Sequence, residues 1–196
     1  MKILESLEKR YSAYNLDKTS ALSNEEIVAL VKQATTLTPS AFNAQTQRVV
    51  ILFGEKSNQF WDLTREAVRK VAPAEGFERT AAKLENFKAQ GTLLFYSDQT
   101  TVKNLQQNFA LYAENFPVWA EQESGMLQLV IWSALAEKGI GASLQHYNPV
   151  VDADVAKEFG IDQGWKLVAQ MPFGGDRGTK ETKEKLPIES RVIVKE

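Results

Sequence analysis

The sequence has no cysteine and only one histidine, His146, among its 196 residues. The lack of cysteine excludes disulfide bonds, iron–sulfur ligation and thiol catalysis, and it suits the reducing cytoplasm. A single histidine argues against a zinc site, which normally needs several histidine or cysteine ligands. We therefore expect a cytoplasmic protein without a metal site.

Neither sign of charge predominates, because 23 basic and 25 acidic residues leave a formal net charge of −2. This balance gives no broad positive field along a nucleic-acid backbone, so no nucleic-acid partner is expected. Long hydrophobic runs are also missing, since the longest, from Met126 to Ala136, contains Gln128 and is far too short to span a bilayer. Residues 1–15 carry charges every few positions, so neither an export signal nor a membrane partner is expected.

What is present is an ordinary globular composition, with 43% hydrophobic and 24% charged residues. No stretch of the chain has the composition of a linker, so we expect one domain over residues 1–196. Hydrophobic periodicity and turn residues predict intermingled helices and strands. The expected helices are an opening helix that ends near residue 9, one from about residue 24 that stops before Pro39, and helices at 58–71, 77–89, 101–112, 124–138 and 152–159; the expected strands are 49–53, 92–97, 166–171 and an edge strand at 191–194.

Four of these elements carry additional signals. Ser23 to Glu26 have the Ser-x-x-Glu form of a capping box, and Gly160 is expected to end the last helix. The β-branched run at 49–53 predicts a central strand buried on both faces. The helix at 124–138 is apolar almost all round, which predicts a core or interface helix with little contact with water.

Two glycine-containing segments resemble nucleotide-binding motifs but lack essential residues. Gly139-x-Gly141 is followed by Leu144 where a dinucleotide fingerprint has its third glycine. In the segment from Gly174 to Lys180, Thr179 separates the last glycine from the lysine, unlike in a phosphate-binding loop. Neither segment is interpreted as a nucleotide site.

The remaining candidates for chemistry are weak when taken singly. His146 has no serine or cysteine motif beside it and no second histidine, so hydrolysis is not supported. Core packing is the default expectation for single tryptophans such as Trp119, Trp132 and Trp165.

Four separated segments make a more specific pattern. Each alone has an ordinary explanation as a basic helix end, an asparagine turn, core packing or a solvated lysine-rich tail. The segments are Arg10-Tyr11-Ser12; Pro39-Ser40-Ala41-Phe42-Asn43-Ala44-Gln45; the stretch from Trp119 to Leu144-Gln145-His146-Tyr147-Asn148-Pro149; and Met171-Pro172-Phe173-Gly174, followed by Lys183 and Lys185. Together they resemble the FMN-dependent nitroreductase-like family along nearly the whole chain, and in particular a subgroup of short members similar to the fungal fatty-acid-repression proteins.

The resemblance implies an α+β fold, in which a central, mostly antiparallel sheet is flanked by helices, and an intertwined homodimer with each FMN in the subunit interface. The first and last segments would hold the phosphate, since a guanidinium binds phosphate through two hydrogen bonds and a hydroxyl adds a donor. The implied phosphate-binding residues are Arg10, Tyr11, Ser12, Lys183 and Lys185, with Lys180 as an alternative to either lysine.

The two middle segments would contact the flavin ring, whose edges need both hydrogen-bond donors and acceptors, as asparagine and glutamine amides provide. The resemblance implies that the phosphate-binding residues come from one chain and the ring contacts partly from the other. The implied ring contacts are Pro39, Ser40, Asn43, Gln45, Leu144, Gln145, His146 and Tyr147, with Gly174 in the closing motif, and the candidate acceptor pocket is lined by Phe42, Phe109, Phe116 and Trp119.

The sequence departs from the family pattern at two positions. Tyr11 stands where classical members have a second basic residue, and Tyr14 stands where some members have a lysine near the flavin pyrimidine. Because reduced flavin gains negative charge near N1, some donor or cation is expected there. Arg48 is the candidate, and a surface charge at the start of a strand is the alternative interpretation.

The implied function is a ping-pong oxidoreductase, in which NADH or NADPH reduces FMN and a nitroaromatic, quinone or similar small acceptor oxidises it. No catalytic side chain is required, because the flavin carries the redox chemistry. Two alternatives remain open at this point: a flavin-binding redox or stress sensor with incidental reductase activity, and a flavin-free binding module that shares only the fold.

Overall fold

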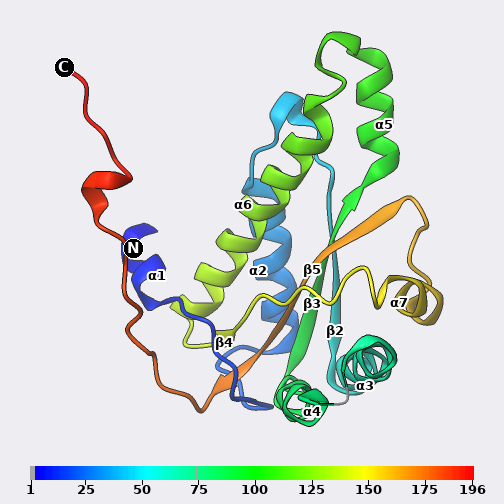
Figure 1. Cartoon of the computed structure of the whole chain (residues 1–196), viewed down its shortest axis with the longest axis vertical. Coiled ribbons are helices and arrows are strands. Elements are labelled where there is room, and N and C mark those ends of the chain that lie inside the picture. Colours follow the sequence, from blue (N-terminus) through cyan, green and yellow to red (C-terminus); the bar gives the residue numbers. More distant parts are fainter. Residues whose placement is uncertain (1–2, 74) are drawn as a thin grey trace.

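A computed structural model describes residues 3–73 and 75–196 of the protein (Figure 1). It has the expected α+β fold, built on an antiparallel sheet with the strand order β1-β5-β3-β2, in which β4 also pairs with β5. The strands are β1 (Leu16–Asp17), β2 (Gln47–Phe53), β3 (Gly91–Asp98), β4 (Gly141–Ala142) and β5 (Trp165–Asp176).

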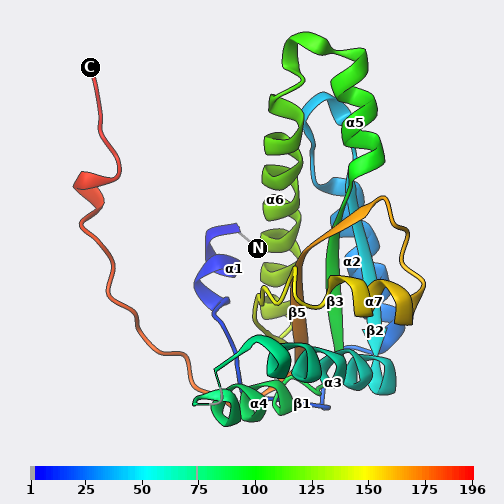
Figure 2. The ribbon, with the colours of Figure 1, turned by 45° about the vertical axis from the view of Figure 1, so that its right-hand side comes forward.

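Helices cover both faces of this sheet (Figures 1 and 2). α2 and α6 pack on one face around Phe95 and Met171, and α3, α4 and α7 pack on the other around Leu94 and Leu167. The helices are α1 (Ile3–Lys9), α2 (Asn24–Leu37), α3 (Gly54–Val71), α4 (Phe77–Glu85), α5 (Gln99–Asn108), α6 (Asn115–Glu137) and α7 (Asp152–Phe159); short 3-10 helices lie at Ala41–Asn43, Ala110–Tyr112 and Ile188–Ser190.

The prediction that residues 49–53 form a central strand was wrong in one respect. These residues belong to β2, which lies at the edge of the sheet, whereas β3 is central and is buried at every position. The apolar run arises because helices cover both faces of β2, and this gives an edge strand the pattern of a central one. Of these two strands, β3 alone has a neighbouring strand on each side.

The local signals at helix ends are confirmed. The Ser23 hydroxyl accepts the Glu26 N–H, the Glu26 carboxylate accepts the Ser23 N–H, and Gly160 ends α7 with a left-handed φ of 63°. Other boundaries shifted: α3 begins at Gly54, and α4 ends at Glu85 rather than near residue 89.

The sequence prediction for the start of α6 was wrong. The aromatic segment around Phe116 and Trp119 is the start of this helix and not a separating loop, because Pro117 falls in the first turn, where its missing N–H costs nothing. In the single protomer Leu129 and Val130 are 44% and 40% exposed, so the prediction of a core or interface helix stays a prediction for this face. The buried side of the helix is largely apolar and also holds the polar side chains of Glu123, Ser124, Gln128 and Ser133.

The last twenty residues run along the outside of the protein. Every residue from 177 to 196 is exposed, and this tail leads away from the sheet (Figure 1). The edge strand predicted at 191–194 was wrong for the described protomer, because these residues have no strand partner in it. Period-2 apolar residues indicate a strand only where a neighbouring strand edge is available.

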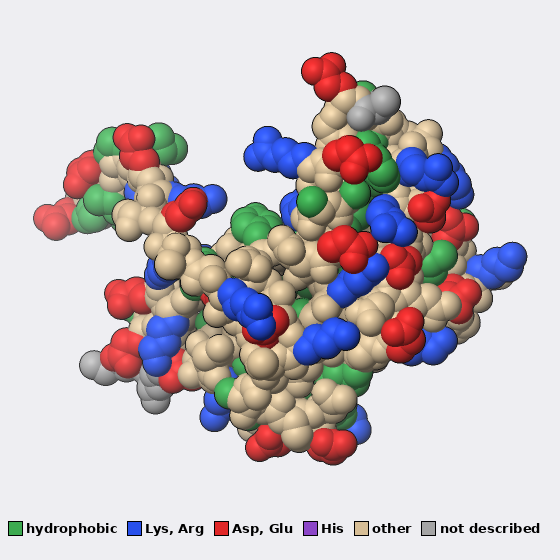
Figure 3. All heavy atoms as spheres, turned by 90° about the horizontal axis from the view of Figure 1, so that it is seen from below, with side chains coloured by type: hydrophobic (Ala, Val, Ile, Leu, Met, Phe, Trp, Pro, Cys, Tyr) green, Lys and Arg blue, Asp and Glu red, His purple; other side chains and the backbone are tan. Residues whose placement is uncertain are grey.

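The surface agrees with the balanced charge. Seen from below, acidic and basic side chains intermingle over the face shown in Figure 3, without a broad patch of one sign. Across the described ranges, 3–73 and 75–196, no helix combines the length and apolar character needed to cross a membrane.

Candidate functional site

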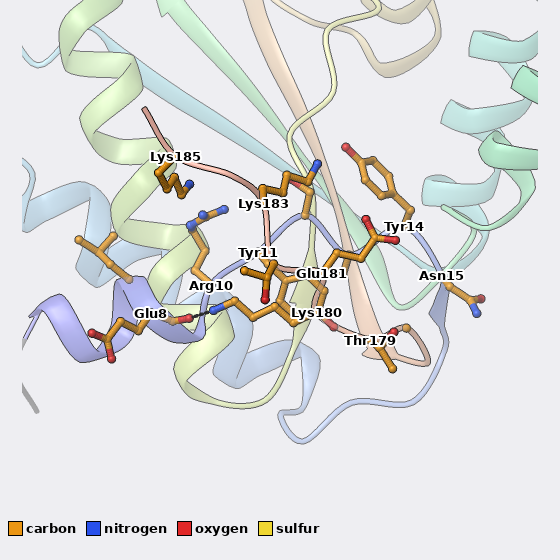
Figure 4. Close-up of a pocket in the computed structure, with 15 residues that line it drawn as sticks. Glu8, Arg10, Tyr11, Tyr14, Asn15, Thr179, Lys180, Glu181, Lys183 and Lys185 are labelled. Atoms are coloured by element: carbon orange, nitrogen blue, oxygen red, sulfur yellow. Dashed lines mark hydrogen bonds between the residues drawn. The ribbon is translucent and has the colours of Figure 1, made fainter. Parts of the chain in front are cut away.

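A cleft of about 700 Å³ opens between the segment that leaves α1 and the tail that leaves β5 (Figure 4). Residues 7–8 and 10–15 form one wall, and residues 178–183 and 185 form the other. The two walls are far apart in sequence, and β1 brings them together by pairing Leu16 and Asp17 with the end of β5. Arg177 adds to this link, because its N–H donates to Asn15 O and its guanidinium pairs with Asp17.

All five residues predicted to hold a phosphate line this cleft. Two belong to the tail, Lys183 and Lys185, and three follow α1, Arg10, Tyr11 and Ser12. Together with Lys180, the lining contains four cationic side chains and the two carboxylates of Glu8 and Glu181, and hence a net charge of +2. The cleft can therefore attract an anion although the protein as a whole is slightly acidic.

Lys180 is less available than the other two lysines. Its ammonium donates to the carbonyl oxygen of Glu8, close to the end of α1 (Figure 4). This interaction stabilises a carbonyl that the last turn of the helix leaves without a partner. Lys183 and Lys185 form no ion pair with any residue in the described ranges, so they are the better candidates for an anion.

Tyr11 lines the cleft, but its hydroxyl already has a partner. The phenol donates to the Asp176 carboxylate at the end of β5. Burial and this hydrogen bond, together with the negative charge of Asp176, raise the pKa of Tyr11 to about 12. Tyr11 can therefore contact a ligand through its ring. The neighbouring cationic side chains supply the positive charge that classical family members have in a basic residue at this position.

Ser12 and the run from Leu144 to Tyr147 lie near each other in one protomer. Ser12 forms a parallel bridge with Ala142, and Gln145 continues along β5 with two backbone hydrogen bonds to Gln170, of 2.7 and 2.9 Å. The Gln170 side chain also accepts the Tyr147 N–H at 2.8 Å. The ends of this run are thus fixed to the sheet, and the His146 side chain between them is exposed.

Gly174 has a packing reason to be glycine. It lies buried in β5, and a Cβ atom there would collide with the Asp17 carbonyl oxygen and come within 2.9 Å of Ala89. Any larger residue would push β1 away and deform the cleft wall. Its predicted contact with a cofactor remains a prediction.

The loop from Pro39 to Gln45, predicted to be irregular, contains the short 3-10 helix Ala41–Asn43, and its backbone is strained. Phe42, Asn43 and Gln45 have φ values of 56°, 52° and 49°, in the left-handed region that side chains other than glycine rarely adopt. The Ser40 hydroxyl accepts the Gln45 N–H at 3.0 Å, and the Ser40 carbonyl accepts the Asn43 N–H at 3.1 Å. Such strain costs on the order of 1–3 kcal/mol per residue and is typical of functional loops.

Phe42 anchors this loop in a group of aromatic side chains. Its ring centroid lies 5.3 Å from Phe109, 5.4 Å from Phe116 and 5.7 Å from Trp119, on which it stacks at 19°. The four residues predicted to line an acceptor pocket therefore meet. Tyr112, which was not predicted to belong to the pocket, also packs here, with its ring centroid 5.5 Å from that of Phe42. Its helical spacing from Phe109 could have indicated this position.

Arg48 and Asp98 hold the other end of the loop. Arg48 donates to the carbonyl oxygens of Gln45 and Gln47 at 2.8 and 2.9 Å, and it pairs with Asp98 at 2.7 Å. Although burial raises the pKa of Asp98, hydrogen bonds from Thr101 and the positive charge of Arg48 outweigh it and lower this pKa. Arg48 thus supports the loop in the protomer, and its predicted place near the flavin remains a prediction.

Glu123 is a buried carboxylate that the sequence analysis did not select. It is 1% exposed on α6, and its Oε1 accepts the Gln47 N–H at 3.1 Å. Burial raises the pKa of Glu123, against backbone hydrogen bonds from Gln47 and Thr46 that favour the charged form. The start of β2 is therefore held from both sides, by Glu123 and by Arg48.

The loop and the cleft do not meet within one protomer. Phe42 packs on Trp119 in the first half of α6, whereas Arg10 lies over Trp132 in the second half. At 1.5 Å per residue, these two points on the helix are roughly 20 Å apart. One protomer thus presents the predicted phosphate site and the predicted loop at different places along the same helix.

Comparison with known proteins identifies the family of this chain. The sequence model of the nitroreductase family matches residues 7–175. The chain belongs to the nitroreductase family. Two relatives from Saccharomyces cerevisiae match this nitroreductase over most of their length: HBN1 is 33% identical over 87% of this chain and 86% of its own, and the nitroreductase FRM2 is 30% identical over 92% and 91%. These fungal relatives confirm the predicted subgroup.

Solved structures agree with the fold of this nitroreductase. The nitroreductase CinD from Lactococcus lactis, solved with chloramphenicol, is 41% identical, covers both chains completely and superposes with a TM-score of 0.91. CinD was also solved with 4-nitrophenol, with a TM-score of 0.90. The chain is therefore an oxidoreductase of the nitroreductase type.

Proposed function

We propose that this nitroreductase is an FMN-dependent NAD(P)H oxidoreductase that works as a homodimer on nitroaromatics, quinones or similar small acceptors. The observation that carries the proposal is the convergence of Arg10, Ser12, Lys183 and Lys185 on one cleft. These residues are separated by more than 170 positions in the sequence, so their meeting is a property of the fold. Proteins of this family bind FMN, and one structure with the same fold, from Desulfovibrio desulfuricans, contains it.

The donors of the cleft fit a phosphate monoester. A phosphate dianion would meet a lining of net charge +2, with a planar guanidinium from Arg10, ammonium groups from Lys183 and Lys185, and the hydroxyl of Ser12. The volume of about 700 Å³ is within the range of cofactor pockets. Asp176, whose carboxylate accepts the Tyr11 hydroxyl, is not among the residues that line the cleft.

A second protomer would complete the site. The loop around Asn43 lies roughly 20 Å along α6 from Arg10, so the flavin ring can reach a loop only if another copy supplies it. Exposed apolar side chains on α6, such as Leu129 and Val130, offer a face for that copy, and a twofold axis would use the same face on both chains. The exposed tail, with Ile193 and Val194, could extend along the partner.

FMN, when bound, supplies the redox chemistry by taking hydride from a reduced nicotinamide and passing electrons to the acceptor. The protein's residues position the reactants. The amides of Asn43 and Gln45 can both donate and accept hydrogen bonds at the edges of a flavin. The aromatic group around Phe42 and Trp119 is partly exposed, with Phe42 at 51%, and it offers flat apolar surfaces for an aromatic acceptor. The 4-nitrophenol bound by CinD supports this acceptor class.

The test begins with the cofactor. Purified protein should show flavin absorption bands that bleach with NADH or NADPH and return when a nitroaromatic or quinone is added. Steady-state turnover should reach at least about one per second with one of these acceptors, within the usual enzyme range. Turnover far below this value with every acceptor would instead support the redox sensor, and protein that does not take up FMN would refute the proposal.

Arg10→Ala tests the phosphate assignment. Removing a charge-assisted hydrogen bond costs about 1.5–3 kcal/mol, so FMN affinity should fall about tenfold or more. Arg65→Ala is the matched control, because Arg65 is a partly exposed arginine on α3 whose ion pairs lie outside the cleft. Equal FMN affinities of the two variants would contradict the assignment of Arg10.

A further inference from the structure

Trp132 contacts Arg10 in one wall of the cleft and the neighbouring strand β4. It is 9% exposed on α6, and the Arg10 guanidinium lies over its indole ring, 4.2 Å from the ring centroid. On the other side, the indole Nε1–H donates to the carbonyl oxygen of Ala142 at 3.1 Å. One buried side chain thus contacts a cation of the cleft and the strand that precedes the Leu144–Tyr147 run.

The Ala142 carbonyl oxygen is a shared acceptor. It accepts the Trp132 Nε1–H and also the Ala13 N–H, at 3.1 and 3.0 Å. A carbonyl oxygen has two lone pairs, and both are used here. Because Ser12 also pairs with Ala142 in a parallel bridge, the segment after α1 is fixed to β4 at the point where Trp132 meets it.

This arrangement fits a support for Arg10. The ring contacts the guanidinium, while no hydrogen bond or ion pair to the Arg10 side chain is found among residues 3–73 and 75–196. The guanidinium N–H groups point outward in the plane of the group, so contact with its face leaves these donors free for an anion. A cation held on an aromatic face also loses less freedom when the anion binds than one that moves in water.

We propose that Trp132 is a positioning residue for the phosphate of FMN: its ring holds Arg10 toward the cleft, and its N–H fixes the Ala13–Ala142 contact beside it. The inference rests on the FMN dependence proposed above and adds a residue that touches neither the phosphate nor the reacting atoms. It also explains why an indole, with both an aromatic face and a donor, occupies a helix position where leucine would fill the core.

The test compares FMN with riboflavin, which has the same ring and no phosphate. Affinities of the flavin-free protein for both ligands are measured by flavin fluorescence in the wild type, Trp132→Phe and Trp132→Leu. Trp132→Leu removes the aromatic face, so the preference for FMN over riboflavin should fall roughly three- to thirtyfold. Trp132→Phe retains a face and loses only the N–H, so its preference should stay within about threefold of the wild type.

Two further variants separate positioning from a general structural effect. Trp165→Leu is the matched control, because Trp165 also carries an arginine, Arg48 at 5.7 Å, but lies outside the cleft. Its FMN preference should equal that of the wild type. The double variant Arg10→Ala with Trp132→Leu should lose no more preference than Arg10→Ala alone, since Trp132 acts through Arg10.

The outcomes are distinguishable. A wild-type protein that binds neither flavin refutes the proposed function and this inference with it. If the wild type prefers FMN, the inference alone is refuted by an unchanged preference in Trp132→Leu, or by losses that add in the double variant. Trp132→Phe serves as the deciding variant if Trp132→Leu does not fold, because a preference in Trp132→Phe as low as in Arg10→Ala would also overturn the inference.

Discussion

Replacing Asp98 with asparagine separates two roles of this side chain, whose Oδ2 also accepts the Thr101 hydroxyl at 2.9 Å. Asp98 is the N-cap of α5, where it accepts the N–H groups of Thr100 and Thr101, and it is also the ion-pair partner of Arg48. Asparagine is an equally good N-cap, so Asp98→Asn keeps the first role and removes the charge needed for the second. The variant therefore measures how much the ion pair contributes to holding the loop.

The expected magnitude follows from burial. The Arg48 and Asp98 side chains are 32% and 12% exposed, so their 2.7 Å pair is intermediate between a surface pair, worth up to about 1 kcal/mol, and a buried charged hydrogen bond, worth about 1.5–3 kcal/mol. We expect Asp98→Asn to lower the free energy of unfolding by about 1.5 kcal/mol, measured as a lower urea midpoint at unchanged m-value. Arg48→Met, measured alone and with Asp98→Asn, gives the coupling energy, expected at about 1 kcal/mol.

The pH dependence supplies a second check. Because the folded protein lowers the pKa of Asp98, the stabilisation is present above the unfolded value of about 3.9 and is lost as the pH falls through the lowered folded value. The difference between wild type and Asp98→Asn should thus be complete above about pH 5 and shrink below about pH 4. A coupling energy under about 0.3 kcal/mol, or a difference that does not shrink in acid, would show that Arg48 is not held by this charge.

Two other substitutions test the core around the site. Gly91→Ala places a Cβ 2.7 Å from the Leu52 carbonyl oxygen and 2.5 Å from the Phe173 ring, so it should lower the free energy of unfolding by about 2 kcal/mol or more. Gly125→Ala is the control, because its Cβ meets nothing within 4 Å, and it should not lower this free energy. Equal urea midpoints of the two variants would contradict this prediction. Glu123→Gln keeps an acceptor for the Gln47 N–H and removes the ionisable carboxyl group, whose pKa is raised by burial. As the pH rises from about 4.3 through the raised folded pKa of Glu123, its ionisation lowers the free energy of unfolding of the wild type. Urea titrations should therefore show Glu123→Gln becoming more stable relative to the wild type over this pH range. A stability difference that does not change with pH would count against the raised pKa.

Much of the fold follows from local rules in the sequence. The capping box at Ser23, the glycine that ends α7 and the apolar runs of β2 and β3 each depend on nearby residues, and the structure confirms these elements. The order of the strands does not follow from such rules. β2 and β3 have similar patterns because helices cover both, and only the pairing of β5 with β3 decides which one is central.

The candidate site likewise has a part that the sequence predicts and a part that it does not. The basic residues near Arg10 and Lys183 could be grouped from the sequence by their family resemblance and by the chemistry that phosphate requires. The contacts beside them could not be predicted. Asp176, which binds Tyr11, looks like an ordinary strand end, and Trp132, which contacts Arg10, looks like an ordinary core residue. Their roles arise from contacts across more than 100 positions of the chain, which no local pattern records.

The left-handed backbone of the loop limits what can replace Phe42. Glycine would relax the φ of 56° but would remove the ring that stacks on Trp119, and a β-branched residue would keep bulk at the cost of a worse backbone. Neither substitution both relieves the backbone strain at this position and keeps the packing against the aromatic group. Attempts to stabilise the protein through this loop should therefore loosen the surface against which its ligand would rest, and gains in robustness are better sought on the distant helices α3 and α4.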